Sequence, residues 1–260
     1  MFWPETPETP QTQWQGSLFG DVAAAIDATF ADMDRVSLDE RCWIDVARGW
    51  LSGADTVFDE LSTTVTWRQR IVTMYERRLP EPRLTSWWSE RSGGDAEPLP
   101  ILNDARRALS EHYGCVFDSI GYNWYRQGDD SVAWHGDRFA KTVVNPTIAI
   151  VSVGAARPFR VRPKPGGAAP RGRSRSFDVG YGDLLVMGGA CQHEWQHSVP
   201  KVSRPVGPRI SITFRHDADY RPRDISSSPT SARPDHRASS EAGAPPRPAR
   251  PDSGDRRSRA

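Results

Sequence analysis

The sequence predicts an α+β fold, in which a front part with helices packs on a β-rich back part. Apolar residues recur at helical spacing in two stretches of the first half, at 19–40 and 98–114. From about Ile120 the pattern changes to short runs with period-two alternation, separated by Gly and Pro. Many short strands of this kind favour a sandwich or a barrel.

The first helix is expected within 19–40 and the second within 98–114. In the second, Asn103 is a candidate N-cap, and Gly114 would end the helix. The expected strands lie within 119–128, 146–154, 158–163, 175–189 and 208–216. We therefore expect the helices to come first and the sheets to follow.

Composition favours one globular domain with ragged ends. The chain has 260 residues, of which 37% are hydrophobic and 10% aromatic, enough to bury a sizeable core. Residues 1–16 are rich in Pro, Thr and Gln, and residues 221–260 in Ser, Pro, Arg and Ala. Neither end can bury enough apolar surface to offset the entropy of ordering. We expect a flexible N-terminal segment, a single domain at 17–220 and a disordered tail.

The cysteines and the hydropathy of the chain further narrow the class of protein that the sequence predicts. Cys42, Cys115 and Cys191 are odd in number and lack C-x-x-C spacing, so no disulfide framework or cysteine zinc site is indicated. No apolar run approaches the roughly 20 residues that cross a bilayer, and the start of the chain does not read as a leader. We expect a monomeric, cytoplasmic protein without membrane association. A net charge of +1 does not decide whether nucleic acid is a partner.

One stretch, His193 to His197, spells the H-E-x-x-H signature of zinc peptidases. That chemistry needs both histidines on one face of a stable helix. A strand-like run and two glycines, Gly188 and Gly189, precede the motif, and Pro200 follows it, which leaves little room for a helix. A zinc peptidase is a remote alternative.

A second set of residues suits a different metal. His135 and Asp137 are two residues apart, and in an extended chain such side chains project to the same face. A third ligand, His197 or His193, would complete two histidines and one carboxylate. This is the facial triad of non-haem Fe(II) oxygenases, which leaves sites open for a co-substrate and dioxygen.

The run "PRISITFRH" places Arg209 and Arg215 on one strand face, with Ser and Thr between them and apolar residues on the other face. Such a face either lies in solvent at a sheet edge or binds a dicarboxylate, because a guanidinium pairs bidentately with a carboxylate. 2-Oxoglutarate is such a dicarboxylate. Asn123 and Tyr125 also share a strand face and could hydrogen-bond the same acid.

Taken together, these segments resemble the AlkB family of Fe(II)/2-oxoglutarate dioxygenases. The matching segments cover roughly residues 80–216 and run in family order: "PRLTSWW", "NWYRQGDDSVAWHGD", "PTIAIVSVGAARPFRVRP", "GDLLVMGG", "WQHSVP" and "PRISITFRH". The resemblance implies a double-stranded β-helix, or jelly-roll, at about 120–216, flanked by helices, and a substrate lid at about 67–93. It also implies that the domain at 17–220 is a dioxygenase domain.

The resemblance also implies roles for single residues. The Fe(II) ligands would be His135, Asp137 and His197, because the second histidine of the family lies in a W-x-H-S-x-P context. The contacts of 2-oxoglutarate would be Asn123, Tyr125, Arg209 and Arg215. His193 would then be a bystander.

The implied reaction is oxidative demethylation of N-alkylated nucleobases in DNA, or in RNA, which reverses alkylation damage directly. A base inside a duplex cannot reach such an iron, so it must be flipped out or lie in a single strand. Two rival functions stay open. One is a 2-oxoglutarate dioxygenase that acts on a protein or a small molecule, and the other is a nucleic-acid binder without catalysis.

Candidate substrate contacts follow from the composition of the lid region. Trp67, Tyr75, Trp87 and Trp88 are interleaved with arginines such as Arg83, as in a stacking platform beside a phosphate backbone, although each ring could equally be packed in a core. A second basic run, 157–175, could lie along phosphates.

The residues after the second predicted ligand also bear on the substrate. Several family members place an acidic residue two positions after the triad Asp. Here Phe139 stands there, preceded by Arg138. Phenylalanine can pack or stack, but it cannot accept a hydrogen bond from the exocyclic amine of a base. Both residues are therefore candidate substrate contacts, and the lesion is left open.

Overall fold

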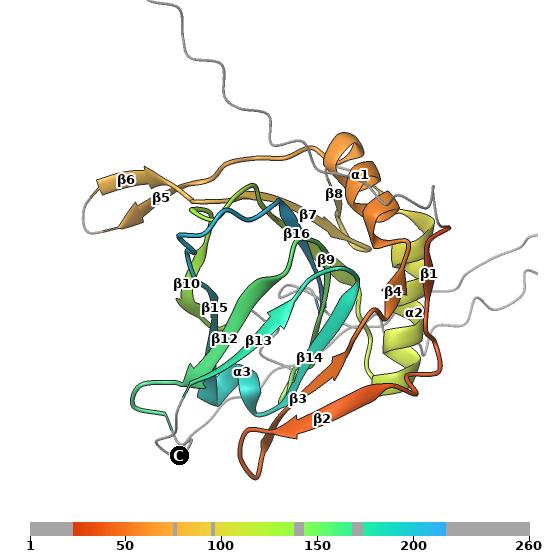
Figure 1. Ribbon diagram of the computed structural model, residues 1–260. Helices are drawn as coiled ribbons and strands as arrows, with labels where there is room; N and C mark the ends of the chain where they lie inside the picture. The colour runs from red at the N-terminus through yellow and green to blue at the C-terminus, as the bar shows by residue number, and fades with distance from the viewer. Residues whose placement is uncertain (1–22, 75–76, 95–96, 138–142, 168–173, 217–260) are drawn as a thin grey trace, which may run out of the picture. The chain divides into compact units, whose positions relative to one another are not determined.

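Two antiparallel sheets make up most of the computed structural model, which describes residues 23–74, 77–94, 97–137, 143–167 and 174–216 (Figure 1). The larger sheet has the strand order β2-β3-β14-β11-β16-β9-β7-β8. Its strands are β2 (Met33–Ser37), β3 (Cys42–Ala47), β14 (Asp183–Gly189), β11 (Ile148–Gly154), β16 (Arg209–Arg215), β9 (Ser119–Tyr125), β7 (Leu84–Ser89) and β8 (Gly93–Gly94). The smaller sheet consists of β10 (Val132–His135), β15 (Trp195–Val199), β12 (Arg157–Pro163) and β13 (Arg175–Val179), in that order.

The remaining elements are short strand pairs and helices. β1 (Ala25–Ile26) pairs with β4 (Leu51–Ser52), and β5 (Ile71–Met74) pairs with β6 (Arg77–Pro80). The helices are α1 (Ala54–Thr64), α2 (Pro100–Tyr113) and the four-residue α3 (Cys191–Glu194). None of the described helices is long and apolar enough to span a membrane.

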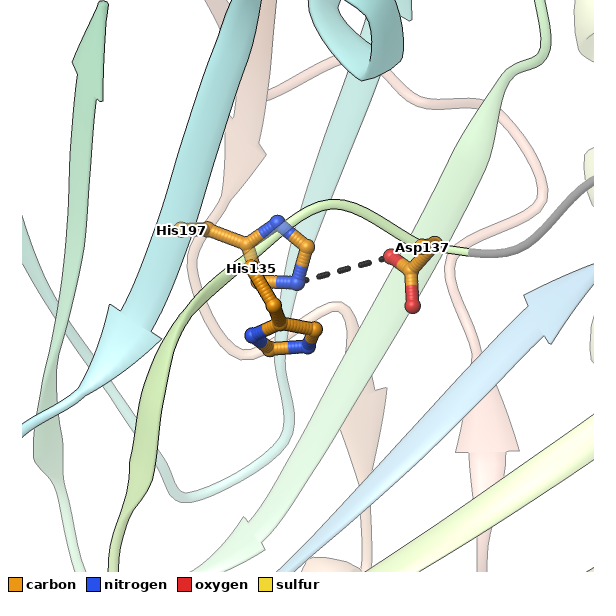
Figure 2. Close-up of side chains that lie close together, drawn as sticks. All are labelled: His135, Asp137 and His197. Carbon is orange, nitrogen blue, oxygen red and sulfur yellow. Dashed lines mark ion pairs between the residues drawn. The ribbon is translucent and has the colours of Figure 1, made fainter. Parts of the chain in front are cut away.

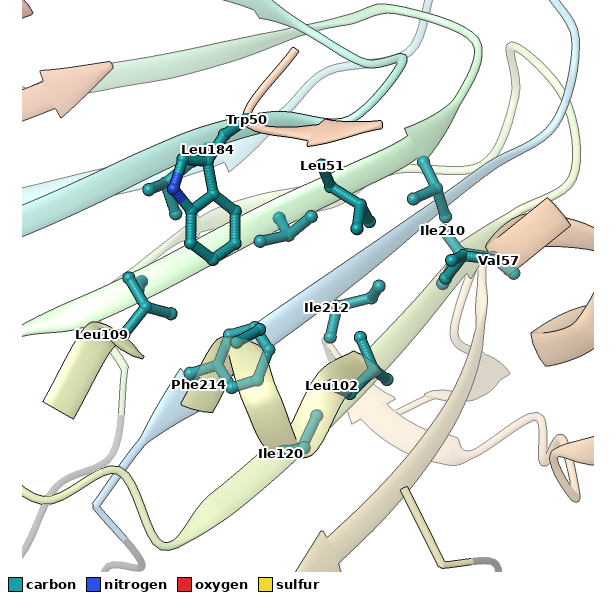
Figure 3. Packing of buried hydrophobic residues seen from close by; sticks show 14 of the residues in the cluster. Trp50, Leu51, Val57, Leu102, Leu109, Ile120, Leu184, Ile210, Ile212 and Phe214 are labelled. Atoms are coloured by element: carbon teal, nitrogen blue, oxygen red, sulfur yellow. The ribbon is translucent and has the colours of Figure 1, made fainter. Parts of the chain in front are cut away.

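Side-chain alternation along the larger sheet creates two separate cores. In β11, Ala149 and Val151 face the cluster that also contains the buried residues of α1 and α2, whereas Ile148 and Ile150 face the cluster shared with the smaller sheet. Figure 3 shows the helix side, where side chains of both helices meet those of β16 and β9. The helices thus cover the outer face of the larger sheet, and the space between the two sheets is left for polar groups at one end.

This arrangement confirms the predicted jelly-roll core with flanking helices. The helix predicted within 98–114 is confirmed as α2, and Gly114 ends it with φ 62°, the left-handed conformation that favours glycine. The N-cap prediction was wrong. The helix begins at Pro100, which has no N–H to leave unpaired in the first turn, and Asn103 instead donates to the Pro98 carbonyl at 3.5 Å.

The prediction of a helix within 19–40 was wrong for residues 23–40, the part of this stretch that the structure describes. That part holds β1 and β2, and β2 pairs with β3 from Met33 to Ser37. Strand partners farther along the chain, β4 for β1 and β3 for β2, therefore override the helical propensity of this stretch. Strands β2 and β3 extend the larger sheet with residues far before position 120, and residues 1–16 and 221–260 lie outside the described residues.

Candidate metal and co-substrate centre

Three predicted metal ligands converge where β10 and β15 pair. His135 at the end of β10 lies opposite His197 on β15, and Asp137 follows two residues after His135. Ligand atoms of the three side chains all lie within 4.8 Å of one another, and the two imidazole centres are 4.3 Å apart (Figure 2). Residues some sixty positions apart in the sequence can therefore reach a single ion.

The hydrogen bonds around the triad leave a nitrogen of His135 and an oxygen of Asp137 available to a metal. The Nδ1 of His135 donates to the Ala133 carbonyl at 2.8 Å, which leaves its Nε2 lone pair for a metal. Asp137 Oδ1 accepts from Arg215 Nη1 at 3.0 Å, whereas its Oδ2 is buried without a hydrogen-bond donor among the described residues. A buried carboxylate oxygen without a donor suits a cation.

The electrostatics of the triad favour metal binding over protonation. Burial lowers the pKa of His197 to about 4, so its imidazole is neutral at pH 7, the form that binds a metal. Burial by itself would raise the pKa of Asp137, but His197 and Arg215 outweigh burial and hold it below its usual value. The site therefore offers the ionised carboxylate of Asp137 and the neutral imidazole of His197.

A second group with metal-ligating side chains, Asp39, Cys42 and Glu194, provides a contrast. Asp39 already accepts from the Arg41 N–H and from Trp195 Nε1, both at 2.8 Å, and Glu194 is paired with the Arg41 guanidinium. Burial strongly raises the pKa of the Cys42 thiol, which keeps it protonated. Hydrogen bonds therefore satisfy this group without an ion, unlike the triad.

The H-E-x-x-H spelling does not form a peptidase site. His193 is exposed in the short α3, where its Nε2 donates to the Val144 carbonyl at 2.7 Å, and His197 lies on strand β15. The two histidines are thus not on one helix face. Glu194, the would-be base, is bound by Arg41. The zinc-peptidase alternative was wrong because the helix ends before the second histidine.

A buried arginine marks an anion site between the sheets. Arg209 is 0% exposed, and its Nη2 donates to Ser152 Oγ at 2.7 Å. Its Nε and Nη1 have no acceptor among the described residues. Burial lowers the pKa of this guanidinium to about 10, so it stays charged at neutral pH. Two free, charged donors in a buried site call for a carboxylate or a similar anion.

The neighbouring strand adds further polar groups to this wall. In the β9–β16 pairing, Tyr125 lies opposite Arg209, and Asn123 lies opposite Ser211. Arg83 Nε donates to the side-chain oxygen of Asn123 at 3.0 Å, so the Asn123 amide N–H groups are left as donors. The polar face of β16 thus turns inward, and the alternative of a solvated edge strand was wrong because β16 lies between β11 and β9.

Both predicted arginines face this interior, since Arg215 contacts Asp137 while Arg209 lies at the other end of the same strand face. The structure therefore brings together all three predicted metal ligands and places Asn123, Tyr125 and both arginines on one adjoining wall. Sequence reasoning missed Ser152 and Gln192, which hold Arg209 and Asp137 respectively. Neither residue type carries a signal in the sequence.

The two adjacent tryptophans of β7 face opposite ways. Trp87 is half-buried, and the Arg215 guanidinium lies 4.5 Å from its ring centre, so it borders the site. Trp88 is only 6% exposed, belongs to the helix-side core and packs under Arg106. The prediction that Trp88 contacts substrate was therefore wrong, because neighbouring residues of a strand point to opposite faces.

Other predicted substrate contacts have structural roles or are not described. Trp67 packs against Tyr122 and Trp124 in the helix-side core, and Arg83 is mostly buried against Asn123 rather than exposed toward a ligand strand. Both residues are partly buried in these contacts, and a contact of either one with substrate stays a prediction. Tyr75, Arg138 and Phe139 lie outside the described residues.

Only part of the predicted basic run is available to a partner. Arg157 is 0% exposed and is enclosed by backbone carbonyls, those of Gln127, Gly128, Asp130 and Pro200, at 2.8–3.3 Å. It braces the loops on which those carbonyls lie and cannot contact phosphates. Arg160 and Arg175, farther along the β12–β13 hairpin, are exposed.

Comparisons with known proteins agree with this geometry. A family profile described as the 2OG-Fe(II) oxygenase superfamily matches residues 49–215. The Mus musculus protein named alpha-ketoglutarate-dependent dioxygenase alkB homolog 3 is 35% identical over 177 residues, covering 64% of this chain and 62% of that protein. The Arabidopsis thaliana DNA oxidative demethylase ALKBH2 is 29% identical over 193 residues, covering 62% and 61%. An uncharacterized protein of Acanthamoeba polyphaga mimivirus is 30% identical over 172 residues, covering 61% and 86%.

The match thus spans less than two thirds of the length of the first two relatives. The family profile covers well over half of this chain, and the relatives carry AlkB names. The chain belongs to the 2OG-Fe(II) oxygenase superfamily and, within it, to the AlkB family.

Proposed function

We propose that this protein is an Fe(II)- and 2-oxoglutarate-dependent dioxygenase that demethylates N-alkylated bases in DNA, or in RNA, and so reverses alkylation damage directly. One observation carries the proposal. The interior holds a candidate cation site and a candidate anion site. Asp137 Oδ2 has no hydrogen-bond donor among the described residues and lies 3.5 Å from Nε2 of the second ligand, His197, and two guanidinium nitrogens of Arg209 have no hydrogen-bond acceptor there. A metal with a dicarboxylate bound to it would satisfy both.

In this proposal His135, Asp137 and His197 hold Fe(II), as two imidazoles and one carboxylate do in non-haem oxygenases. Iron, 2-oxoglutarate and dioxygen together supply the oxidation of an N-methyl group, which is released as formaldehyde. The chain holds and orients these groups. Arg215 fixes Asp137 through one oxygen and leaves the other for the metal, and Phe159 packs on the His197 ring with centres 5.2 Å apart.

The co-substrate would lie along the β9 and β16 wall. Arg209 would pair with one carboxylate, while Asn123 and Tyr125 add neutral donors beside it. Burial of Tyr125 raises the pKa of its hydroxyl, which therefore stays a hydrogen-bond donor at neutral pH. Because Arg209 and Tyr125 are buried, their contacts form with little competition from water.

The nucleic-acid part of the proposal rests on the names of the relatives and on Trp87. A methylated base must leave its stack to reach a buried metal. Among the predicted aromatic residues that the structure describes, Trp87 borders the site, and the Arg215 guanidinium lies over its ring. We assign Trp87 to contact the extruded base, with a stacking contribution of about 1 to 3 kcal/mol.

Mass spectrometry of methylated oligonucleotides tests the proposal. Single- and double-stranded oligonucleotides with 1-methyladenine or 3-methylcytosine would be incubated with the protein, Fe(II), 2-oxoglutarate and air, with the His135→Ala variant as control. We expect the wild-type protein to remove the methyl group and release succinate, and the His135→Ala variant to do neither. Unchanged lesions together with succinate release on a protein or small-molecule substrate would favour the rival function.

A further inference from the structure

The short helix α3 holds an unusual position in the fold, because its four side chains contact three separate parts of the chain. The Cys191 thiol contacts the Trp43 carbonyl, Gln192 contacts the Asp137 N–H, His193 contacts the Val144 carbonyl and Glu194 contacts Arg41. One of these four contacts reaches the triad. That contact is the one made by Gln192.

The Gln192 amide is buried and its orientation is fixed by its partners. Gln192 is 6% exposed, and its side-chain Oε1 accepts a hydrogen bond from the backbone N–H of Asp137 at 3.2 Å. Its Nε2 points the other way, toward the Met187 sulfur at 3.8 Å, a weak acceptor. Only the oxygen can face an N–H donor, so a reversed amide would leave that donor without a partner.

The contact matters because the sheet does not hold this part of the chain. Strand β10 ends at His135, so Asp137 lies beyond the ladder of the smaller sheet. The loop also passes close to α3, since a Cβ built on Gly136 would lie 3.4 Å from the Gln192 carbonyl oxygen. Gln192 therefore gives the Asp137 backbone a hydrogen-bond partner that regular secondary structure does not provide.

The same segment also leads to the third member of the triad. Helix α3 continues directly into β15, and His197 follows Gln192 by five residues. We infer that Gln192 is a positioning residue, which sets the distance between Asp137 and His197 for a divalent cation by holding the Asp137 backbone against the segment that carries His197. This inference rests on the proposed metal site.

Binding of Mn(II) alone, measured by titration calorimetry, tests the inference without any turnover. The Gln192→Met variant keeps the length of the side chain but loses the acceptor oxygen, and we expect its affinity for Mn(II) to fall about 10- to 100-fold, as for other partners of metal ligands. Gln192→Glu keeps an acceptor oxygen at the same place, so we expect it to bind Mn(II) much more tightly than Gln192→Met does. His193→Ala, one residue away on α3, is the matched control and should bind like the wild type.

Two results would overturn the inference. One is wild-type affinity in Gln192→Met, and the other is an equal loss in Gln192→Met and Gln192→Glu. If Gln192→Met does not fold, the rate of hydrogen exchange at the Asp137 amide of the wild-type protein tests the inference instead. A protected Asp137 amide supports the inference, and an amide that exchanges as fast as an exposed one contradicts it. A wild-type protein that binds no Mn(II) overturns both proposals, whereas one that binds Mn(II) but leaves methylated oligonucleotides unchanged overturns only the proposed function.

Discussion

Replacement of Arg209 by Met should change stability and co-substrate binding in opposite directions. Burial lowers the pKa of the Arg209 guanidinium from 12.5 to about 10, and each pKa unit corresponds to about 1.4 kcal/mol. The buried charge thus costs up to about 3 kcal/mol in the ligand-free protein, because it is charged at pH 7.5 in both the folded and the unfolded chain. Methionine removes that charge and keeps most of the apolar volume.

We therefore expect Arg209→Met to raise the free energy of unfolding of the ligand-free protein by about 1 to 3 kcal/mol, measured by urea titration at pH 7.5. The same variant should bind 2-oxoglutarate, in the presence of Mn(II), more weakly by about 2 to 5 kcal/mol, because the carboxylate loses a charged partner. Calorimetry measures this loss.

Arg157 is the matched control, since it is also a fully buried arginine. Its guanidinium binds four backbone carbonyls, so Arg157→Met leaves these acceptors without a donor and should lower the free energy of unfolding by about 3 kcal/mol. An Arg209→Met variant that loses stability in the same way and binds 2-oxoglutarate normally would refute the assignment of Arg209 to an anion site.

Two further predictions concern pH and the tryptophans. The metal-free protein should lose about 2 kcal/mol of unfolding free energy between pH 7.5 and pH 5, because the unfolded chain protonates His197 near pH 6.5 and the folded chain only near pH 4. Because the pKa of Asp137 is lowered in the folded chain, the unfolding free energy should fall further at more acid pH. Urea titrations in the presence of a chelator measure both losses, and equal stability at pH 7.5 and pH 5 would contradict the prediction. Trp87→Ala should weaken binding of a methylated single strand by about 1 to 3 kcal/mol in fluorescence anisotropy. Trp88→Ala should instead lower the free energy of unfolding by about 3 to 5 kcal/mol, and the reverse pattern would exchange the roles of the two rings.

Local patterns predicted the parts of the fold that depend on local interactions. Helix α2 could be read from its apolar spacing, and Gly114 marked its end because a left-handed residue is needed there. The prediction within 19–40 failed because β2 gains its hydrogen bonds from β3, and no local pattern reports such a partner.

The candidate site shows the same division. Period-two alternation placed Arg209 and Arg215 on one strand face, but it could not say whether that face is buried, since this depends on β16 lying inside the sheet. The same alternation could have separated Trp87 from Trp88 beforehand. Gln192 was beyond prediction, because its role depends on a contact with a loop 55 residues earlier in the chain.

The central claim is that His135, Asp137 and His197 hold Fe(II) together with 2-oxoglutarate. Visible absorption under anaerobic conditions tests it most directly, since Fe(II) chelated by 2-oxoglutarate should give a weak charge-transfer band. We predict this band for the wild type and for His193→Ala, and its absence in His135→Ala and His197→Ala. A band that persists in His197→Ala and is lost in His193→Ala would contradict the claim.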